Sequence, residues 1–222
     1  MSNIVKNTTF PNLLDLLAPH SCRGCGHIGS PLCNCCKNNI ILDHLYNSPK
    51  PKLPKTFPPT FIISNRIGLM NNLIHDFKYN SVRALAKPLA EILHQTLPPI
   101  ESPVSIIPLP TISHHVRHRG LDHTRLIAKY LAKFRRYKVE KILIRAQNTV
   151  QVGSDRQTRL AQAKSAYAIA PHTKINPQTT YILLDDVWTT GASMKAAVKK
   201  LRQSGAQKII IALLAVSRLD QN

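Results

Sequence analysis

Near its C-terminus the chain reads Tyr181-Ile-Leu-Leu-Asp185-Asp186-Val-Trp-Thr189-Thr190-Gly191-Ala192-Ser193. The apolar run at the start of this stretch predicts a buried β-strand that is closed by two carboxylates. Residues 194–201 follow with helical spacing, which places Met194, Val198 and Leu201 on one face. Gly205 is expected to end that helix. The stretch therefore predicts a strand, a turn and a helix in direct succession.

The turn between this strand and helix has the chemistry of a sugar-phosphate site. Its backbone N–H groups lie at the positive end of the helix dipole, and its hydroxyl side chains add further donors to a phosphate. Gly191 lets the backbone approach such a phosphate closely. Asp185 and Asp186 cannot bind phosphate, but paired carboxylates suit ribose hydroxyls and Mg²⁺. The alternative is an ordinary capped helix after a strand, with solvated acids.

The same stretch resembles the phosphoribosyl-pyrophosphate (PRPP) motif of the type I phosphoribosyltransferases, without a gap from Ile182 to Ser193. In that family a hydrophobic strand ends in two acids and continues through Thr-Thr-Gly-x-Ser/Thr. The resemblance implies that PRPP and Mg²⁺ are bound by Asp185, Asp186, Thr189, Thr190, Gly191, Ala192 and Ser193. Trp188 is bulkier than the family's usual residue, and either packing at the sheet edge or stacking on a ligand would account for it.

Length and composition predict a cytoplasmic protein. A chain of 222 residues with 43% hydrophobic content suits one substantial domain and a small appendage. Its longest apolar run, Ile209 to Val216, is too short to span a bilayer. The N-terminus lacks the charged region and long apolar core of a signal peptide. We therefore expect no membrane span.

The formal net charge of +19 is unusual and favours a polyanionic partner, with nucleic acid first and anionic lipid second. Basic proteins also occur without binding DNA, so the charge alone does not decide. From His114 to Arg145 there are ten Lys and Arg but only two acids. Tyr130 and Phe134 fit a buried helical stripe there, whereas Tyr137 remains a candidate for stacking on a base. The expected nucleic-acid contacts are Arg117, Arg119, Arg125, Lys129, Arg135 and Arg136.

The five cysteines all lie between Cys22 and Cys36. The Cys-x-x-Cys pairs Cys22/Cys25 and Cys33/Cys36 can present four thiolates to one ion, which predicts a structural zinc site with no open coordination position. Cys35 is left over. A disulfide cluster is the alternative, but a cytosolic chain without cysteine in its main domain argues against it.

The order of elements predicts an α/β fold. Strands are expected at residues 60–64, 104–107, 141–144, 166–169, 181–184 and 208–216, and helices at 65–77, 81–96, 121–134 and 194–201; residues 37–46 read as either helix or strand. Pro88 is expected to kink or restart its helix. The alternation predicts a mainly parallel sheet with helices on both faces. We expect a zinc module at 1–46, a Pro- and Lys-rich linker at 47–59 and a phosphoribosyltransferase-like domain at 60–222.

Further segments resemble the ComF (ComFC/GntX-like) family in the family's own order. They are the paired cysteines, Phe77-Lys78-Tyr79, Ile107 to Pro110 continuing to Arg119-Gly120, and Arg145 to Arg159. Members couple a zinc module to a phosphoribosyltransferase domain and are associated with uptake and handling of transforming single-stranded DNA. The chain departs from the usual Arg-Gly-Phe-Asn-Gln at Leu121-Asp122-His123.

The resemblance also implies further roles. Residues 109–113 would contact pyrophosphate, and a hood carrying Arg145, Gln151, Arg156 and Arg159 would close over it. PRPP, single-stranded DNA and a DNA-uptake helicase are the implied partners. Two functions follow: handling of incoming single-stranded DNA in natural transformation with a retained PRPP/Mg²⁺ site, or a true phosphoribosyltransferase that acts on a nucleobase-like or nucleotide acceptor and releases pyrophosphate.

Overall fold

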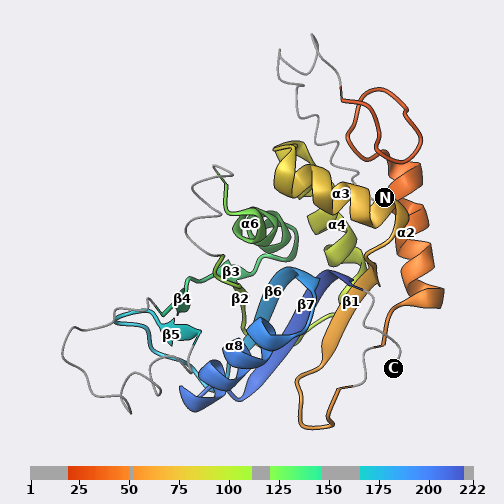
Figure 1. The fold of residues 1–222 in the computed structure, drawn as a ribbon. Helices are drawn as coiled ribbons and strands as arrows, with labels where there is room; N and C mark the ends of the chain where they lie inside the picture. Colours follow the sequence, from red (N-terminus) through yellow and green to blue (C-terminus); the bar gives the residue numbers. More distant parts are fainter. Residues whose placement is uncertain (1–19, 51–52, 112–120, 147–165, 218–222) are drawn as a thin grey trace, which may run out of the picture.

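A five-stranded parallel sheet, in the order β1-β7-β6-β2-β3, forms the centre of the protein (Figure 1). The structure is a computed structural model that describes residues 20–50, 53–111, 121–146 and 166–217. The strands are β1 (Thr60–Asn65), β2 (Val104–Pro108), β3 (Lys138–Val139), β6 (Thr180–Trp188) and β7 (Lys208–Val216).

Helices lie on both faces of this sheet. They are α2 (Asn34–Asn47), α3 (Gly68–Tyr79), α4 (Ala86–Thr96), α6 (His123–Arg135) and α8 (Ala192–Gln203), with a short 3₁₀ turn, η1 (Arg83–Leu85), before α4. Residues 37–46, predicted as helix or strand, are helical. Pro88 lies in the first turn of α4, where its missing N–H has no intrahelical partner. It therefore marks a restart of the helix rather than a kink.

The alternation of side chains along β6 explains why both faces are covered. Ile182 and Leu184 join the hydrophobic cluster under α3, α4 and α6, whereas Tyr181 and Leu183 join the cluster under α8. Successive side chains of a strand point to opposite faces, so an almost wholly apolar strand needs a layer on each side. The predicted α/β fold with a parallel sheet and helices on both faces is confirmed.

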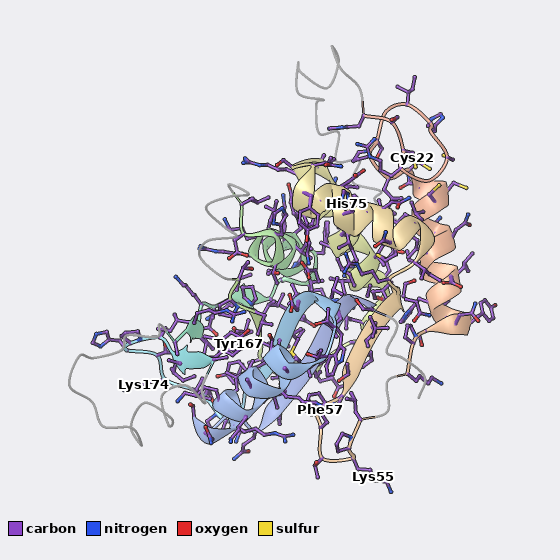
Figure 2. The ribbon with its side chains drawn as sticks, in the orientation of Figure 1. Cys22, Lys55, Phe57, His75, Tyr167 and Lys174 are labelled. Carbon is purple, nitrogen blue, oxygen red and sulfur yellow. The ribbon has the colours of Figure 1, made fainter. Side chains whose placement is uncertain are left out.

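Two predicted strands do not belong to this sheet. β4 (Leu143–Arg145) and β5 (Tyr167–Ile169) pair antiparallel in a separate two-stranded sheet. Leu143 and Tyr167 are buried in the α8-side cluster, and Figure 2 shows Tyr167 on this small sheet beside α8. The place beside β2 is taken instead by β3, which the sequence did not predict. β4 and β5 are therefore held in place by their burial against the α8 side, and not by pairing with a strand of the main sheet.

β6 is longer than predicted and carries the acid pair inside it rather than after it. Its ladder with β7 continues to Trp188, which pairs with Val216. Its ladder with β2 stops near Leu184, whose carbonyl accepts a last bond from Leu109 N at 2.8 Å. Past this point β6 has a neighbour on one side only, and the other side opens at the acids.

The N-terminal segment shares the core of the main domain. Cys22, Leu32 and Cys36 belong to the same cluster as α3 and α4. Two ion pairs add to this contact, Lys37 Nζ to Glu91 Oε2 and Arg23 Nε to Asp76 Oδ2, both at 2.6 Å. The division into a module, a linker and a domain stays a prediction of the sequence.

Within the described residues, no helix is both long enough and apolar enough to cross a lipid bilayer.

Candidate functional site

A cavity of about 380 Å³ opens where β2 parts from β6. It is lined by the end of β6 and the following turn, the start of α8, the loop after β2, the start of α6 and the last turn of α3. Arg145 of β4 and Leu213 of β7 complete the lining. The lining includes Lys78, Leu109, Pro110, Thr111, His123, Thr124, Arg145, Asp185, Asp186, Trp188, Thr189, Gly191, Ser193 and Met194. The structure thus gathers most of the predicted PRPP-motif residues around one space.

Asp186 is buried and forms an ion pair that the sequence did not predict. Its Oδ1 lies 2.7 Å from Lys78 Nζ, and the two side chains are 10% and 16% exposed. Because both groups are largely removed from water, their mutual attraction is screened less than that of a surface pair. Asp186 is therefore held next to a cation contributed by α3.

Asp185 carries a carboxyl group that is more easily protonated than that of an ordinary aspartate. Burial, with the charge of Asp186 beside it, raises the pKa of Asp185 to about 8. The backbone N–H of Asp186, which donates to Asp185 Oδ1 at 2.9 Å, acts in the opposite direction, as do Lys78 and Thr124. At neutral pH the ligand-free pair therefore holds one proton and one lysine counter-charge.

The turn after β6 is built around Gly191. Its φ of +71° is in the left-handed region, and a Cβ there would lie 2.3 Å from Cζ2 of Trp188. Trp188 is 4% exposed and packs edge-on against Phe57, with ring centroids 5.9 Å apart. The indole therefore packs against the turn, and it also lines the cavity. Gly191 is also the N-cap of α8 and offers no side-chain acceptor to the first N–H groups of the helix.

Arg145 brings a second cation to the cavity. Its Nε donates to the carbonyl of Pro110 at 3.1 Å, and its guanidinium lies 5.1 Å from the centre of the Tyr167 ring. Burial raises the pKa of Tyr167, and the charge of Arg145 opposes that shift. The other predicted hood residues, Gln151, Arg156 and Arg159, lie outside the described residues.

These donors fit a sugar phosphate that carries a divalent cation. The paired carboxylates supply hard oxygen ligands, and the turn at the start of α8 supplies N–H and hydroxyl donors. Lys78 and Arg145 supply positive charge for further phosphate groups. Residues 109–111 of the predicted pyrophosphate loop line the same cavity, and residues 112–113 lie outside the described ranges.

Sequence reasoning missed three polar side chains of this cavity: Lys78, His123 and Thr124. His123 is 4% exposed, and its ring meets that of Phe77 edge-on with centroids 4.7 Å apart. Lys78 stands in the Phe77-Lys78-Tyr79 segment, which stands out in the sequence only through a family resemblance. That segment was the one sequence feature that pointed to this position.

The predicted nucleic-acid residues separate into three groups. Arg125, Lys129 and Arg136 are exposed on α6 and at its end. Arg135 instead donates to the carbonyl of Pro98 at 2.7 Å and to those of His94 and Leu97, so it holds the end of α4. Arg117 and Arg119 lie outside the described residues.

The aromatic side chains of this region pack inward. Tyr130 and Phe134 lie against the hydrophobic cluster, as the helical spacing predicted, and so does Tyr137. Tyr137, the remaining candidate for base stacking, is thus half-buried against the core.

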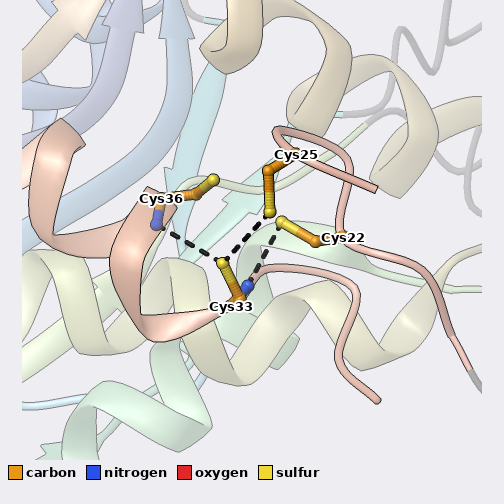
Figure 3. A group of neighbouring side chains, drawn as sticks. All are labelled: Cys22, Cys25, Cys33 and Cys36. Atoms are coloured by element: carbon orange, nitrogen blue, oxygen red, sulfur yellow. Dashed lines mark hydrogen bonds between the residues drawn. The ribbon is translucent and has the colours of Figure 1, made fainter. Parts of the chain in front are cut away.

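The four paired cysteines come together as predicted (Figure 3). The sulfur atoms of Cys22, Cys25, Cys33 and Cys36 all lie within 4.8 Å of one another. Cys25 and Cys33 Sγ are 3.6 Å apart. That separation is far longer than a disulfide bond of about 2.05 Å. It is close to the roughly 3.8 Å that two sulfurs span on a tetrahedral zinc with bonds of about 2.3 Å.

Backbone N–H groups point at these sulfurs. Cys22 Sγ accepts from Gly24 N and Cys33 N, both at 3.4 Å, and Cys33 Sγ accepts from Cys36 N at 3.5 Å. Burial raises the pKa of Cys22, but the backbone hydrogen bonds outweigh it and bring the value to about 6. A thiol that ionises this easily is suited to bind a metal. Cys35 is exposed and stands outside the cluster.

The chain has similarities to several known proteins. Residues 137–220 match the family model of uracil phosphoribosyltransferase. Over 193 residues the chain is 26% identical to Competence protein F of Haemophilus influenzae, which covers 83% of this chain and 81% of that protein. Among solved structures, an adenine phosphoribosyltransferase from Leishmania donovani aligns with a TM-score of 0.39 at 11% identity, over 73% of this chain and 86% of that one.

The parallel sheet and the match over its C-terminal part define a phosphoribosyltransferase-type α/β domain. Its N-terminal extension carries the four-cysteine cluster. Over most of its length the chain is similar to a competence protein, and its C-terminal part is similar to phosphoribosyltransferases.

Metal binding by the four-cysteine cluster can be tested by exchanging one cysteine at a time. The wild-type protein is expected to carry one zinc ion per chain, measured by elemental analysis. Cys36→Ser should lose the ion and more than about 2 kcal/mol of unfolding free energy, because metal binding and folding are coupled at such sites. Cys35→Ser is the matched control and should keep both. Equal zinc content in the two variants would contradict the assignment.

The proton on Asp185 predicts a pH dependence of stability. An unfolded aspartate has a pKa near 3.9, whereas burial raises the pKa of Asp185 in the folded protein to about 8. Between these values the folded state holds the extra proton, so stability should fall as pH rises through this window. In Mg²⁺-free buffer, urea unfolding of wild type should lose on the order of 1 to 2 kcal/mol from pH 6 to pH 8, relative to Asp185→Asn. Identical slopes would contradict this protonation state.

Proposed function

We propose that this protein handles incoming single-stranded DNA in the cytoplasm during natural transformation and retains a site for PRPP and Mg²⁺. One observation supports the site: Asp185 and Asp186 line one cavity together with Lys78, Arg145 and three residues of the turn after β6, which are Thr189, Gly191 and Ser193. The family carries the biological role, through the similarity to Competence protein F.

The residues divide the proposed ligand between them. The turn from Thr189 to Ser193, with the start of α8, would hold the 5′-phosphate. Asp185 and Asp186 would hold the ribose hydroxyls or the cation, and Arg145 would meet the pyrophosphate. When bound, Mg²⁺ supplies charge that compensates the diphosphate.

The basic face of α6 supports the DNA part of the proposal. Arg125, Lys129 and Lys133 are exposed and spaced four residues apart, so they form a stripe of like charge. Such a stripe destabilises an isolated helix slightly and is favourable next to a polyanion. Phosphate contacts by these side chains would bind DNA without reading its sequence.

Two further parts rest on the family. Zinc is proposed as the structural ion of the cysteine cluster, whose sulfur spacing fits it. A DNA-uptake helicase is proposed as the protein partner on the family resemblance.

A true phosphoribosyltransferase is the second candidate, and the cations around the cavity favour it. A ring nitrogen of the acceptor would attack the anomeric carbon of PRPP while the bond to pyrophosphate breaks. Lys78 and Arg145 stand where they could neutralise charge on the departing group. A screen for pyrophosphate release with nucleobases, nucleotides and single-stranded DNA would distinguish turnover from binding alone.

The PRPP site is tested by calorimetry. Wild type should bind PRPP in the presence of Mg²⁺, and Asp185→Asn/Asp186→Asn should bind it about 100-fold more weakly, because hydrogen bonds to two charged groups are lost. Asp43→Asn on α2 removes an exposed acid and serves as the control. Unaltered binding in the double variant would refute the site.

DNA binding is tested by its salt dependence, with fluorescence anisotropy on a labelled single strand. The logarithm of affinity should fall steeply with the logarithm of salt concentration. Arg125→Gln/Lys129→Gln should reduce that slope by about 1.4, since each phosphate contact on a single strand contributes about 0.7.

Lys199→Gln/Lys208→Gln is the control for this experiment. It removes two exposed charges, one of them from α8 on the opposite face of the sheet, and should leave the slope unchanged. A flat response in wild type would refute DNA binding, and equal slopes in all three proteins would refute the α6 surface.

A further inference from the structure

Lys78 reaches the acid pair from a different part of the chain. It stands in the last turn of α3, and its ammonium lies 2.7 Å from Asp186 Oδ1. With 16% of its side chain exposed, it lines the cavity instead of extending into solvent. A lysine is seldom buried this far without a specific partner, and here the partner is a proposed ligand of the sugar or the cation.

The backbone that carries Lys78 is fixed on both sides. Leu73, Ile74 and Phe77 are almost fully buried on the inner face of α3. Asp76 accepts from Arg23 at 2.6 Å and from Asn80 Nδ2 at 2.7 Å, which ties the end of the helix to its surroundings. The ammonium can therefore change its contacts only by rotation of its own side chain.

An ammonium at this place competes with a metal ion. It occupies an oxygen of Asp186 that a divalent cation would use, and its charge repels a bare dication from the cavity. A diphosphate changes this balance, because its negative charges can compensate both the dication and the ammonium. The metal would then enter together with the diphosphate and not before it.

We propose that Lys78 is the resident counter-cation of Asp186, which keeps free divalent metal out of the cavity and moves to the diphosphate when the ligand binds. This inference rests on the proposed PRPP site and names the residue that orders its binding steps. An ion pair with a purely structural role would instead contribute to stability and leave metal affinity unchanged.

Trp188 provides the readout. It is the sole tryptophan of the chain and lines the same cavity, so a bound Mn²⁺ ion should quench its fluorescence. In wild type, Mn²⁺ alone should leave the emission unchanged, and Mn²⁺ with inorganic pyrophosphate should quench it. If the same Mn²⁺ concentration quenches Trp188 equally with and without pyrophosphate, the proposal is overturned. This test needs no variant.

The variant that tests the residue is Lys78→Gln. Its affinity for Mn²⁺ alone should rise about tenfold, because the competing ammonium is gone, and its affinity for PRPP with Mg²⁺ should fall about tenfold. Lys78→Arg keeps the charge and should still exclude Mn²⁺. Lys87→Gln removes an exposed charge from α4 and should behave as wild type.

The two arms separate this inference from the proposed function. An Mn²⁺ affinity that is unchanged or lowered in Lys78→Gln overturns the role of Lys78, whatever PRPP does. If wild type does not bind PRPP, the proposed function fails. The Mn²⁺ affinities of wild type and Lys78→Gln still test whether Lys78 is the counter-cation of Asp186. If Lys78→Gln does not fold, the wild-type experiment with Mn²⁺ and pyrophosphate decides.

Discussion

The site depends on a difference in length between two neighbouring ladders. β6 pairs with β7 as far as Trp188, but its pairing with β2 stops at Pro108. Pro108 and Pro110 have no N–H to offer a ladder, so β2 cannot follow β6 any further. The unpaired side of β6 is where Asp185 and Asp186 stand. A sheet with full pairing on both sides would have filled this space with backbone, and no cavity would have formed.

The burial of both faces decides which elements reach that space. α3 and α6 approach from one side of the sheet and α8 from the other, and their ends meet beyond the end of the β2 ladder. The last turn of α3 contributes Lys78, the first turn of α6 contributes His123 and Thr124, and the start of α8 contributes backbone N–H groups. The acids of β6 are thus surrounded by groups of three separate helices.

Most of the fold could be predicted from the sequence, and about half of the site. Local patterns were enough to predict the strand, turn and helix around Gly191, because their signals lie in neighbouring residues. The same holds for the two cysteine pairs. Lys78 and Thr124 were missed because they lie far from Asp185 in sequence and meet it only after the sheet has formed. Arg135 shows the limit of counting charges, since a count cannot separate an exposed arginine from one that binds three carbonyls. The antiparallel pairing of β4 with β5 was missed because ladder partners are not encoded locally.

Arg23 connects the cysteine loop to helix α3. It stands between Cys22 and Cys25, and its ion pair with Asp76 ends two residues before Lys78. The loop that carries the cysteines is therefore bonded to the same helical turn that faces the acid pair. If occupancy of one site changes affinity at the other, the reverse effect must have the same size. A single turn of helix thus lies between the N-terminal loop and the cavity.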